Sequence, residues 1–527
     1  KDTEDLIEWV KFSGASWAKD SSGFYYSRYP KPKEGAALTE ANKNQTVYFH
    51  KLGTPQSEDK MIYARPDQPD WGLHAYVTDD GHYLIYSVTH GTDPKNRFFY
   101  QDLKQADAKV VELLNDFDAS YSFIENIGTT FYFHTDLKAP RYRVIAIDVT
   151  KPARENWREI IPEGADKLDS VSCVDGQLLC KSLKDARSAM VAYDLEGKKL
   201  RDIELPGIGT VGGFGGKRSD KITHYAFTSF TTPGAIYRYE VASGKSSLWK
   251  QPKVDFDDTP YETTQVFVKS KDGTKVPMFL VHKKGLKLDG NNATLLYGYG
   301  GFDISLTPNF SIGRAIWLEL GGVYALANLR GGGEYGAEWH LAGTKLRKQN
   351  VFDDFIACAE WLQKEGYTSP KKLAIMGGSN GGLLVGACMT QRPELYGAAL
   401  PAVGVMDMLR FHKFTIGWAW KSDYGSSENA DEFAAIYAYS PLHNLKPGTR
   451  YPATLVTTAD HDDRVVPAHS FTFAARLQEC PAKGDDAPPV LIRIETSAGH
   501  GAGTALTKVI EETADEWAFL WKVLGME

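Results

Sequence analysis

The chain has 527 residues, of which 42% are hydrophobic and 24% charged, and its formal net charge at pH 7 is -7. This length exceeds what one hydrophobic core supports, so we expect an ordinary globular protein with two or more domains. The modest net charge favours neither a nucleic-acid nor a membrane-surface partner, and no apolar stretch has membrane-spanning length.

The cysteines give no sign of a disulfide framework or a metal centre. There are five of them, an odd number, and no two form a C-x-x-C pattern. We therefore expect buried thiols, no metal and no organic cofactor. The chain starts at Lys1 inside β-like sequence, so no signal peptide can be judged and the compartment, cytoplasmic or periplasmic, is open.

Two series of aromatic-rich, strand-like runs recur through the first half of the chain. Phe131, Leu178 and Tyr225 of the first series follow one another at intervals of 47 residues. Strand pairs that repeat at about 45 to 50 residues and end in turn signals such as Asp80-Gly81 are typical of β-propeller blades. Five units can be counted, and an irregular β-sandwich is the alternative. The first series is 24–26, 83–86, 131–133, 178–180 and 225–227, and the second is 47–49, 98–100, 144–147, 190–193 and 236–239.

Between Pro252 and Pro260 the pattern changes to short apolar strands alternating with helices. This alternation predicts the α/β class, with a mostly parallel sheet wound on both faces. We divide the chain into a β-propeller domain over 1–254 and an α/β domain over 255–527. We also expect an amphipathic helix after a cap at Asn350. The expected strands are 294–297, 323–326, 373–376, 398–400, 454–456 and 490–492.

The run Gly377 to Gly382 reads GGSNGG and contains the pattern G-x-S-x-G around Ser379. It lies between an expected strand and a run, 383–389, that can form a helix. Strand, sharp turn and helix make this pattern a nucleophile elbow, in which tiny neighbours allow the serine oxygen to project from a strained turn. A glycine-rich turn with an idle serine is the alternative.

A serine hydroxyl becomes a good nucleophile when an imidazole takes its proton, and the imidazole needs a carboxylate to orient it. In α/β-hydrolases these groups follow in the order serine, acid, histidine. Here the loop after the strand near 454–457 holds three candidate acids, Asp460, Asp462 and Asp463. The residues alone do not decide between them.

The candidate base is His500, in a glycine-rich loop after the strand that begins at 490. His461 is its chief competitor, but it lies too close in sequence to the aspartates to bridge one of them to a distant serine. An elbow, an acidic loop and this histidine, in order and each after a strand, predict an α/β-hydrolase triad.

Acyl transfer also needs donors aimed at the oxyanion. One should be the backbone N–H of Asn380, the residue after the nucleophile. Another should come from an earlier strand-end loop, and Tyr297 to Phe302 (YGYGGF) is such a loop, with tyrosines that could supply a phenol. We interpret the Gly-rich run after Arg330 as a tight turn with an arginine near the cleft, because no Lys-Ser or Lys-Thr follows as in a phosphate loop.

With these residues the chain resembles the prolyl oligopeptidase family. The resemblance rests on motifs that span essentially all of the second half and that are specific when taken together. They are GGSNGGLLV (377–385), YGYGGF (297–302), NLRGGGEYG (328–336), VGVMDMLRFHKFTIGWAW (403–420), SPLHN (440–444), DHDDRVVP (460–467) and AGHGAG (498–503).

The resemblance implies a serine endopeptidase that cuts short peptides after proline through an acyl-enzyme. It implies Ser379 as nucleophile, Asp462 as orienting carboxylate and His500 as general base and acid, with the Tyr299 hydroxyl joining the Asn380 N–H in the oxyanion hole. Asp462 is chosen by matching the family's DDRV. The implied partners are short proline-containing peptides, with no nucleic acid or membrane, and we expect a monomer.

The resemblance also implies a proline pocket and a substrate-binding arginine. An apolar slot with an indole face suits a pyrrolidine ring, which has no charge to pair. Arg464 would hydrogen-bond a substrate carbonyl. The implied pocket residues are Phe302, Val405, Trp420, Tyr424 and Val465.

Family propellers have seven blades and an N-terminal piece of the hydrolase domain, so about two blades and a leader are expected to be absent from this sequence. Three other functions compete. A peptidase that cuts after basic residues would need carboxylates in the pocket, an esterase or lipase would prefer acyl esters without proline, and a propeller-based binding protein would have an inert hydrolase half.

Overall fold

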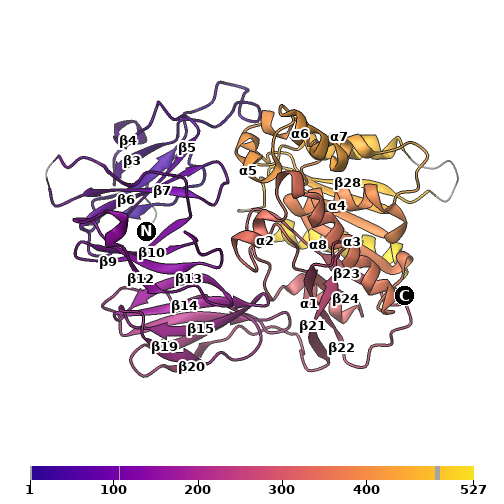
Figure 1. Cartoon of the computed structure of the whole chain (residues 1–527). Helices are drawn as coiled ribbons and strands as arrows, with labels where there is room; N and C mark the ends of the chain where they lie inside the picture. Colours follow the sequence, from indigo (N-terminus) through magenta and orange to yellow (C-terminus); the bar gives the residue numbers. More distant parts are fainter. Residues whose placement is uncertain (1–2, 106, 481–486, 502, 527) are drawn as a thin grey trace.

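The computed structural model describes residues 3–105, 107–480, 487–501 and 503–526. It has an all-β half, indigo to magenta in Figure 1, beside an α/β half, rose to yellow. The first half is built from four-stranded sheets and the second around one eight-stranded sheet. The fold class expected from the sequence is thereby confirmed.

The all-β half contains five four-stranded antiparallel sheets, each formed by four consecutive strands. The two predicted series are the second and third strands of these sheets, so the five expected units are five blades. The aromatic signal is less regular in the first and fourth strands: β5 and β9 each carry two aromatic residues, whereas β16 and β17 carry none. The sheets are β1 (Ser16–Trp17), β2 (Gly23–Arg28), β3 (Thr46–Lys51) and β4 (Lys60–Tyr63); β5 (Trp71–Val77), β6 (Tyr83–His90), β7 (Asn96–Asp102) and β8 (Val111–Leu114); β9 (Tyr121–Ile127), β10 (Thr130–Thr135), β11 (Arg143–Asp148) and β12 (Arg158–Ile161); β13 (Lys167–Val174), β14 (Gln177–Lys184), β15 (Arg187–Tyr193) and β16 (Lys199–Ile203); β17 (Thr210–Gly213), β18 (Ile222–Thr228), β19 (Ala235–Glu240) and β20 (Lys245–Lys250).

The repeated aromatic residues explain the period, because they pack one blade against the next. Between the second and third blades the Tyr83 and Phe131 rings meet edge to face with centroids 4.9 Å apart. Phe98 and Phe133 do the same at 4.7 Å. All four side chains are buried in one cluster. Such aromatic pairs add to the hydrophobic gain of burial, so they help to hold the second blade against the third.

The α/β half is organised on an eight-stranded sheet with the order β21-β22-β24-β23-β25-β26-β27-β28. From β24 to β28 neighbouring strands are parallel, and β22 is antiparallel to both β21 and β24. The six predicted strands are confirmed, and the antiparallel pair at the edge was not predicted. The bounds are β21 (Tyr261–Lys269), β22 (Lys275–Lys283), β23 (Thr294–Tyr297), β24 (Val323–Ala327), β25 (Leu373–Gly378), β26 (Ala398–Ala402), β27 (Ala453–Ala459) and β28 (Val490–Glu495).

Helices cover both faces of this sheet. One buried cluster joins the sheet to α3, α4, α6 and α7, and a second joins its other face to α1 and α8. Parallel strands buried on both faces are fully apolar, as the run Val323–Ala327 illustrates. The helices are α1 (Ile312–Glu319), α2 (Ala337–Leu341), α3 (Gln349–Lys364), α4 (Asn380–Gln391), α5 (Lys421–Tyr424), α6 (Ala430–Tyr439), α7 (Ala468–Gln478) and α8 (Leu506–Val523).

One local prediction was wrong. Helix α3 begins at Gln349, so Asn350 is inside the helix, and its amide donates to the Ala342 carbonyl instead of capping. The guanidinium of Arg330 is buried and binds the Asp354 carboxylate. That carboxylate has no exposed surface. A buried arginine needs such a partner, and this pair joins β24 to α3.

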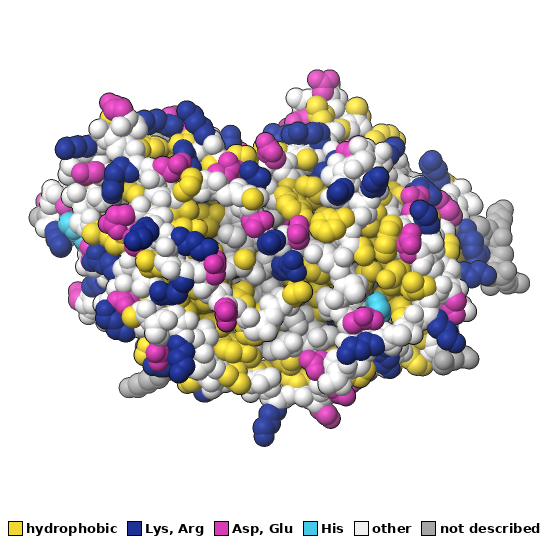
Figure 2. Space-filling model, turned by 60° about the horizontal axis from the view of Figure 1, so that its bottom comes forward, with side chains coloured by type: hydrophobic (Ala, Val, Ile, Leu, Met, Phe, Trp, Pro, Cys, Tyr) yellow, Lys and Arg dark blue, Asp and Glu magenta, His cyan; other side chains and the backbone are white. Residues whose placement is uncertain are grey.

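The surface carries charges of both signs. Figure 2 shows basic and acidic side chains interspersed on one face, with hydrophobic side chains between them. On that face neither sign of charge dominates. Within the described ranges, every helix is too short or too polar to cross a bilayer.

Candidate active site

Ser379 occupies a sharp turn between β25 and α4. Its backbone has φ 59° and ψ -115°, a region that residues with side chains rarely adopt. A side-chain carbon on Gly377 would lie 2.5 Å from the Gly381 carbonyl oxygen, and one on Gly382 would lie 2.5 Å from the Gly404 Cα. The glycines are therefore required by close backbone approaches, which is the geometry of a nucleophile elbow.

Each of the three candidate acids has a different partner. Asp462 is fully buried, and its Oδ2 lies 2.5 Å from Nδ1 of His500. Its Oδ1 accepts the backbone N–H groups of Arg464 and Val465 at 3.0 and 2.9 Å, which fix the carboxylate. Of the three, Asp462 alone reaches His500 among the described contacts.

The other two aspartates are used elsewhere. Asp460 binds its neighbour His461 at 2.6 Å on the surface, where the His461 side chain is 72% exposed. Asp463 pairs with Lys11 of the propeller at 2.7 Å. The sequence argument against His461 agrees with this arrangement, in which an exposed imidazole is occupied by an adjacent carboxylate.

The strands explain why residues so far apart in sequence gather here. Ser379, Asp462 and His500 follow β25, β27 and β28, which belong to one parallel run of the sheet. The carboxyl ends of such strands share one edge. Among the described contacts, no hydrogen bond joins the Ser379 and His500 side chains. In enzymes without substrate, catalytic hydrogen bonds are often long or poorly aligned.

Two donors are placed beside the serine. Asn380 is the first residue of α4, so its backbone N–H has no carbonyl acceptor within the helix. Tyr299 follows β23, which is hydrogen-bonded directly to β25. Burial raises the pKa of Tyr299, and the adjacent Ser379 side chain partly opposes the rise. The phenol therefore keeps its proton at neutral pH and can act as a donor.

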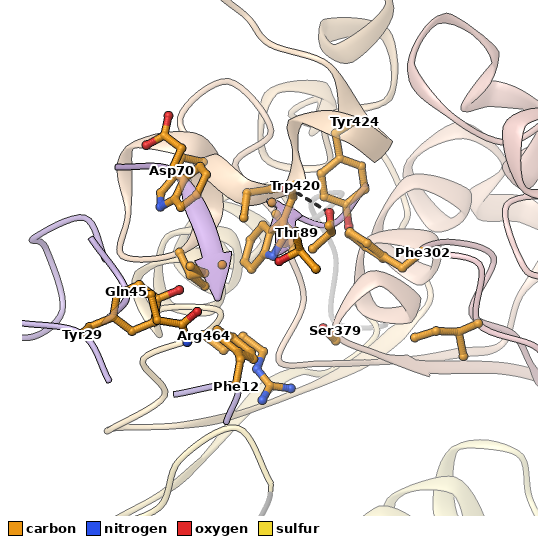
Figure 3. Close-up of a pocket in the computed structure, with 18 of the residues that line it drawn as sticks. Phe12, Tyr29, Gln45, Asp70, Thr89, Phe302, Ser379, Trp420, Tyr424 and Arg464 are labelled. Atoms are coloured by element: carbon orange, nitrogen blue, oxygen red, sulfur yellow. Dashed lines mark hydrogen bonds between the residues drawn. The ribbon is translucent and has the colours of Figure 1, made fainter. Parts of the chain in front are cut away.

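A cavity of about 360 Å³ opens at Ser379 between the two halves of the molecule. Figure 3 shows Phe302, Ser379 and Tyr424 on one side and propeller residues on the other. Pockets of this size hold small ligands or single side chains. Of the predicted site residues, Tyr299, Phe302, Ser379, Val405, Trp420, Tyr424 and Arg464 line it.

The apolar wall of this cavity is made of stacked and edge-packed rings. Trp420 stacks on Phe411 with the planes 12° apart, and Tyr424 meets Phe302 edge to face. Val465 is buried in the core cluster beneath and is not among the lining residues, unlike Val405. Of the five predicted pocket residues, Phe302, Val405, Trp420 and Tyr424 therefore line the cavity, whereas Val465 is buried in the core instead.

The propeller contributes a wall that the sequence analysis did not find. Phe12 and Asp70 both line the cavity, and the Phe12 ring lies 5.4 Å from the Arg464 guanidinium. These residues come from loops and strand ends with no motif, so only the packing of the propeller on the α/β half reveals them. The full set is Phe12, Tyr29, Gln45, Asp70, Gly72, His74, Thr89, Gly91 and Thr92.

Comparison with known proteins identifies the family. Residues 1–252 match the family model described as "Prolyl oligopeptidase, N-terminal beta-propeller domain", and residues 308–527 match "Prolyl oligopeptidase family". The chain belongs to the prolyl oligopeptidase family. It is 48% identical to a prolyl endopeptidase of Elizabethkingia miricola over 99% of this chain and 73% of the relative.

Solved structures of the family share the fold over nearly all of the chain. One, from a structural and mechanistic analysis of two prolyl endopeptidases, has a TM-score of 0.93 at 45% identity and covers 99% of this chain and 76% of its own. Another is prolyl oligopeptidase B from Galerina marginata bound to a 25mer macrocyclization substrate. Its TM-score is 0.93 at 38% identity, with 100% of this chain and 74% of that chain covered.

Proposed function

We propose that this member of the family is a serine endopeptidase that hydrolyses short peptides on the carboxyl side of proline. The observation that carries the proposal is the buried Asp462–His500 pair at the same sheet edge as the Ser379 elbow. The aromatic cavity that begins at that serine supports the substrate class. We place the domain boundary after residue 254, between β20 and β21.

The reaction begins at the elbow. The Ser379 oxygen attacks the carbonyl carbon of the proline residue while His500 takes the hydroxyl proton through Nε2. Asp462, held at Nδ1, fixes the tautomer and stabilises the imidazolium. A modest movement of the loop around His500 joins its ring to Ser379 when substrate is bound.

The tetrahedral intermediate carries its negative charge on the former carbonyl oxygen. The Asn380 N–H and the Tyr299 hydroxyl donate to that oxygen, and so stabilise its charge. His500 then gives its proton to the leaving amine, the C–N bond breaks, and an acyl-enzyme remains. Water, deprotonated by the same imidazole, releases the peptide acid and restores the serine.

The cavity favours proline over a basic residue. Its lining near Ser379 is aromatic and aliphatic, which suits a ring without charge. One carboxylate, Asp70, lines it from the propeller side, but Lys43 lies 2.9 Å from that carboxylate and offsets its charge. Arg464 is the group that would hydrogen-bond a substrate backbone carbonyl, and we expect the enzyme to act as a monomer.

Turnover of matched proline and arginine reporter peptides tests this specificity. We expect hydrolysis of the proline peptide, complete loss in Ser379→Ala, and little hydrolysis of the arginine peptide. A preference for arginine would refute the pocket assignment. Activity that persists in Ser379→Ala would refute the nucleophile.

A further inference from the structure

The loop after β23 carries two groups on which the proposed reaction depends. Tyr299 supplies an oxyanion donor and Phe302 a pocket wall. The loop is strained, because Phe302 and its neighbour Asp303 have φ of 58° and 57°. Residues with side chains keep such conformations only when their surroundings impose them. Contacts from outside the loop must therefore hold it in shape.

One such contact comes from a lysine that has almost no access to solvent. Lys348 is 1% exposed, and its Nζ donates to the Gly300 carbonyl at 2.9 Å and to Oδ1 of Asn380 at 3.2 Å. Burying an ammonium group is costly unless its protons have acceptors. Here burial lowers the pKa of Lys348 to about 8, and the charge of Asp423 opposes that fall.

The Asn380 side chain links Lys348 to Tyr299 through hydrogen bonds. Its Oδ1 accepts from Lys348 and, at 2.9 Å, from the Tyr424 hydroxyl, while its Nδ2 donates to the Tyr299 carbonyl. A side-chain carbon on Gly301 would lie 2.7 Å from that Nδ2. The loop thus packs directly on the Asn380 amide.

The far end of the loop is held by a buried carboxylate. Asp423 has no exposed surface, and its Oδ1 accepts the Phe302 N–H at 2.9 Å. Its two oxygens each lie 3.3 Å from Nε2 of the buried His340. The contact to Phe302 acts at one of the two strained positions, where a backbone hydrogen bond has most effect on the loop's shape.

We propose that Lys348 and Asp423 are positioning residues for the peptidase reaction. Their hydrogen bonds hold the loop 299–302 at Gly300 and at Phe302. Neither residue lines the cavity. Lys348 acts through Asn380 and the loop backbone on the Tyr299 hydroxyl, and so on kcat. Asp423 acts through Phe302, and so on selectivity for proline. This inference rests on the proposed roles of Tyr299 and Phe302.

A double-mutant cycle tests the first half. We expect Lys348→Met to lower kcat about 10- to 100-fold on a proline reporter, as a misplaced donor would, with KM changed less than about threefold. In a Tyr299→Phe background the same substitution should change kcat less than about twofold, because the hydroxyl it positions is absent. A matched control is Lys372→Met, since Lys372 also donates to two carbonyls, those of Leu524 and Gly525, away from the site.

The outcomes separate the two proposals. A Tyr299→Phe enzyme with wild-type kcat would refute the donor role of Tyr299 and the role of Lys348 with it. Alternatively, Tyr299→Phe lowers kcat, and adding Lys348→Met to it lowers kcat as much again as Lys348→Met does in the wild type. That result would refute the role of Lys348 alone. Thermal unfolding and circular dichroism give the folded fraction of each variant, to which kcat is normalised.

Asp423→Asn tests the second half and does not depend on the folding of Lys348→Met. An amide preserves the size of the side chain but weakens the hold on the Phe302 N–H and on His340. We expect the kcat/KM ratio of proline over alanine peptides to fall about tenfold. An unchanged ratio in the folded variant would refute the role of Asp423.

Discussion

The Asp462 carboxylate lies 2.5 Å from the His500 imidazole while Asp460 and Asp463, two residues before it and one after it, bind His461 and Lys11. Replacing each of the three acids should therefore have a different effect on kcat. We predict that Asp462→Asn lowers kcat by about 10⁴, because an amide favours the wrong histidine tautomer. Asp460→Asn and Asp463→Asn are the controls and should retain activity within about twofold. Equal losses in all three would contradict the assignment, and steady-state kinetics on a proline peptide measures them.

Trp420 should set the preference for proline. We predict that Trp420→Ala raises the activation free energy obtained from kcat/KM by about 1 to 3 kcal/mol more for a proline peptide than for an alanine peptide. The reason is that the indole face and its stacking on Phe411 are lost. Trp157→Ala, in the propeller away from the cavity, should leave the ratio unchanged. The ratio of the two kcat/KM values is the readout. Equal losses for both peptides would show that Trp420 does not contribute to the preference for proline.

The glycines of the elbow should differ in their tolerance of a methyl group. Gly377→Ala would place a carbon 2.5 Å from the Gly381 carbonyl, whereas the nearest atom to a carbon on Gly378 lies at 3.8 Å. We predict that Gly377→Ala destabilises the protein by about 1 to 3 kcal/mol or more and displaces Ser379. Gly378→Ala should fold and turn over normally. Thermal unfolding and phosphonate labelling compare the pair, and an equally tolerant Gly377 would contradict the elbow geometry.

Glu334 should make stability depend on pH. It is 1% exposed, and burial raises its pKa to about 7. The folded protein then holds a proton that the unfolded chain has lost, so the stabilisation is complete below pH 4.5 and is lost as pH rises through about 7. Glu334→Gln should remove this dependence, which amounts to about 3 kcal/mol. Urea unfolding from pH 5 to pH 8 measures it. If the free energy of unfolding of Glu334→Gln falls with pH as that of the wild type does, another titrating group is responsible.

Much of the fold follows from the sequence because its signals are local. The inner blade strands alternate aromatic residues at a fixed period, and the buried strands of the α/β half are apolar runs such as Val323–Ala327. The first and fourth strands of the blades were not predicted; β20, which reads KSSLWK, is largely exposed. The strands β21 and β22 were also missed, because an antiparallel edge gives no βαβ alternation.

The candidate site could be predicted only where a motif carries it. The elbow and the order of the triad were predicted from the residues, but the choice of Asp462 needed the family resemblance. Lys348 was not found, because in the run KLRKQN it looks like a surface charge. Its burial depends on contacts with Gly300 and Asn380, which are far away in the chain. The burial and contacts of such residues depend on tertiary packing and cannot be predicted from their spacing in the sequence.

The central claim is that Ser379, His500 and Asp462 together cleave peptides after proline. Its most direct test is digestion of a mixed peptide library by the wild-type enzyme and by Ser379→Ala, with the cut sites determined by mass spectrometry. The account predicts cuts concentrated on the carboxyl side of proline in short peptides and none from the variant. Cuts without a proline preference, or cuts that survive in Ser379→Ala, would contradict it.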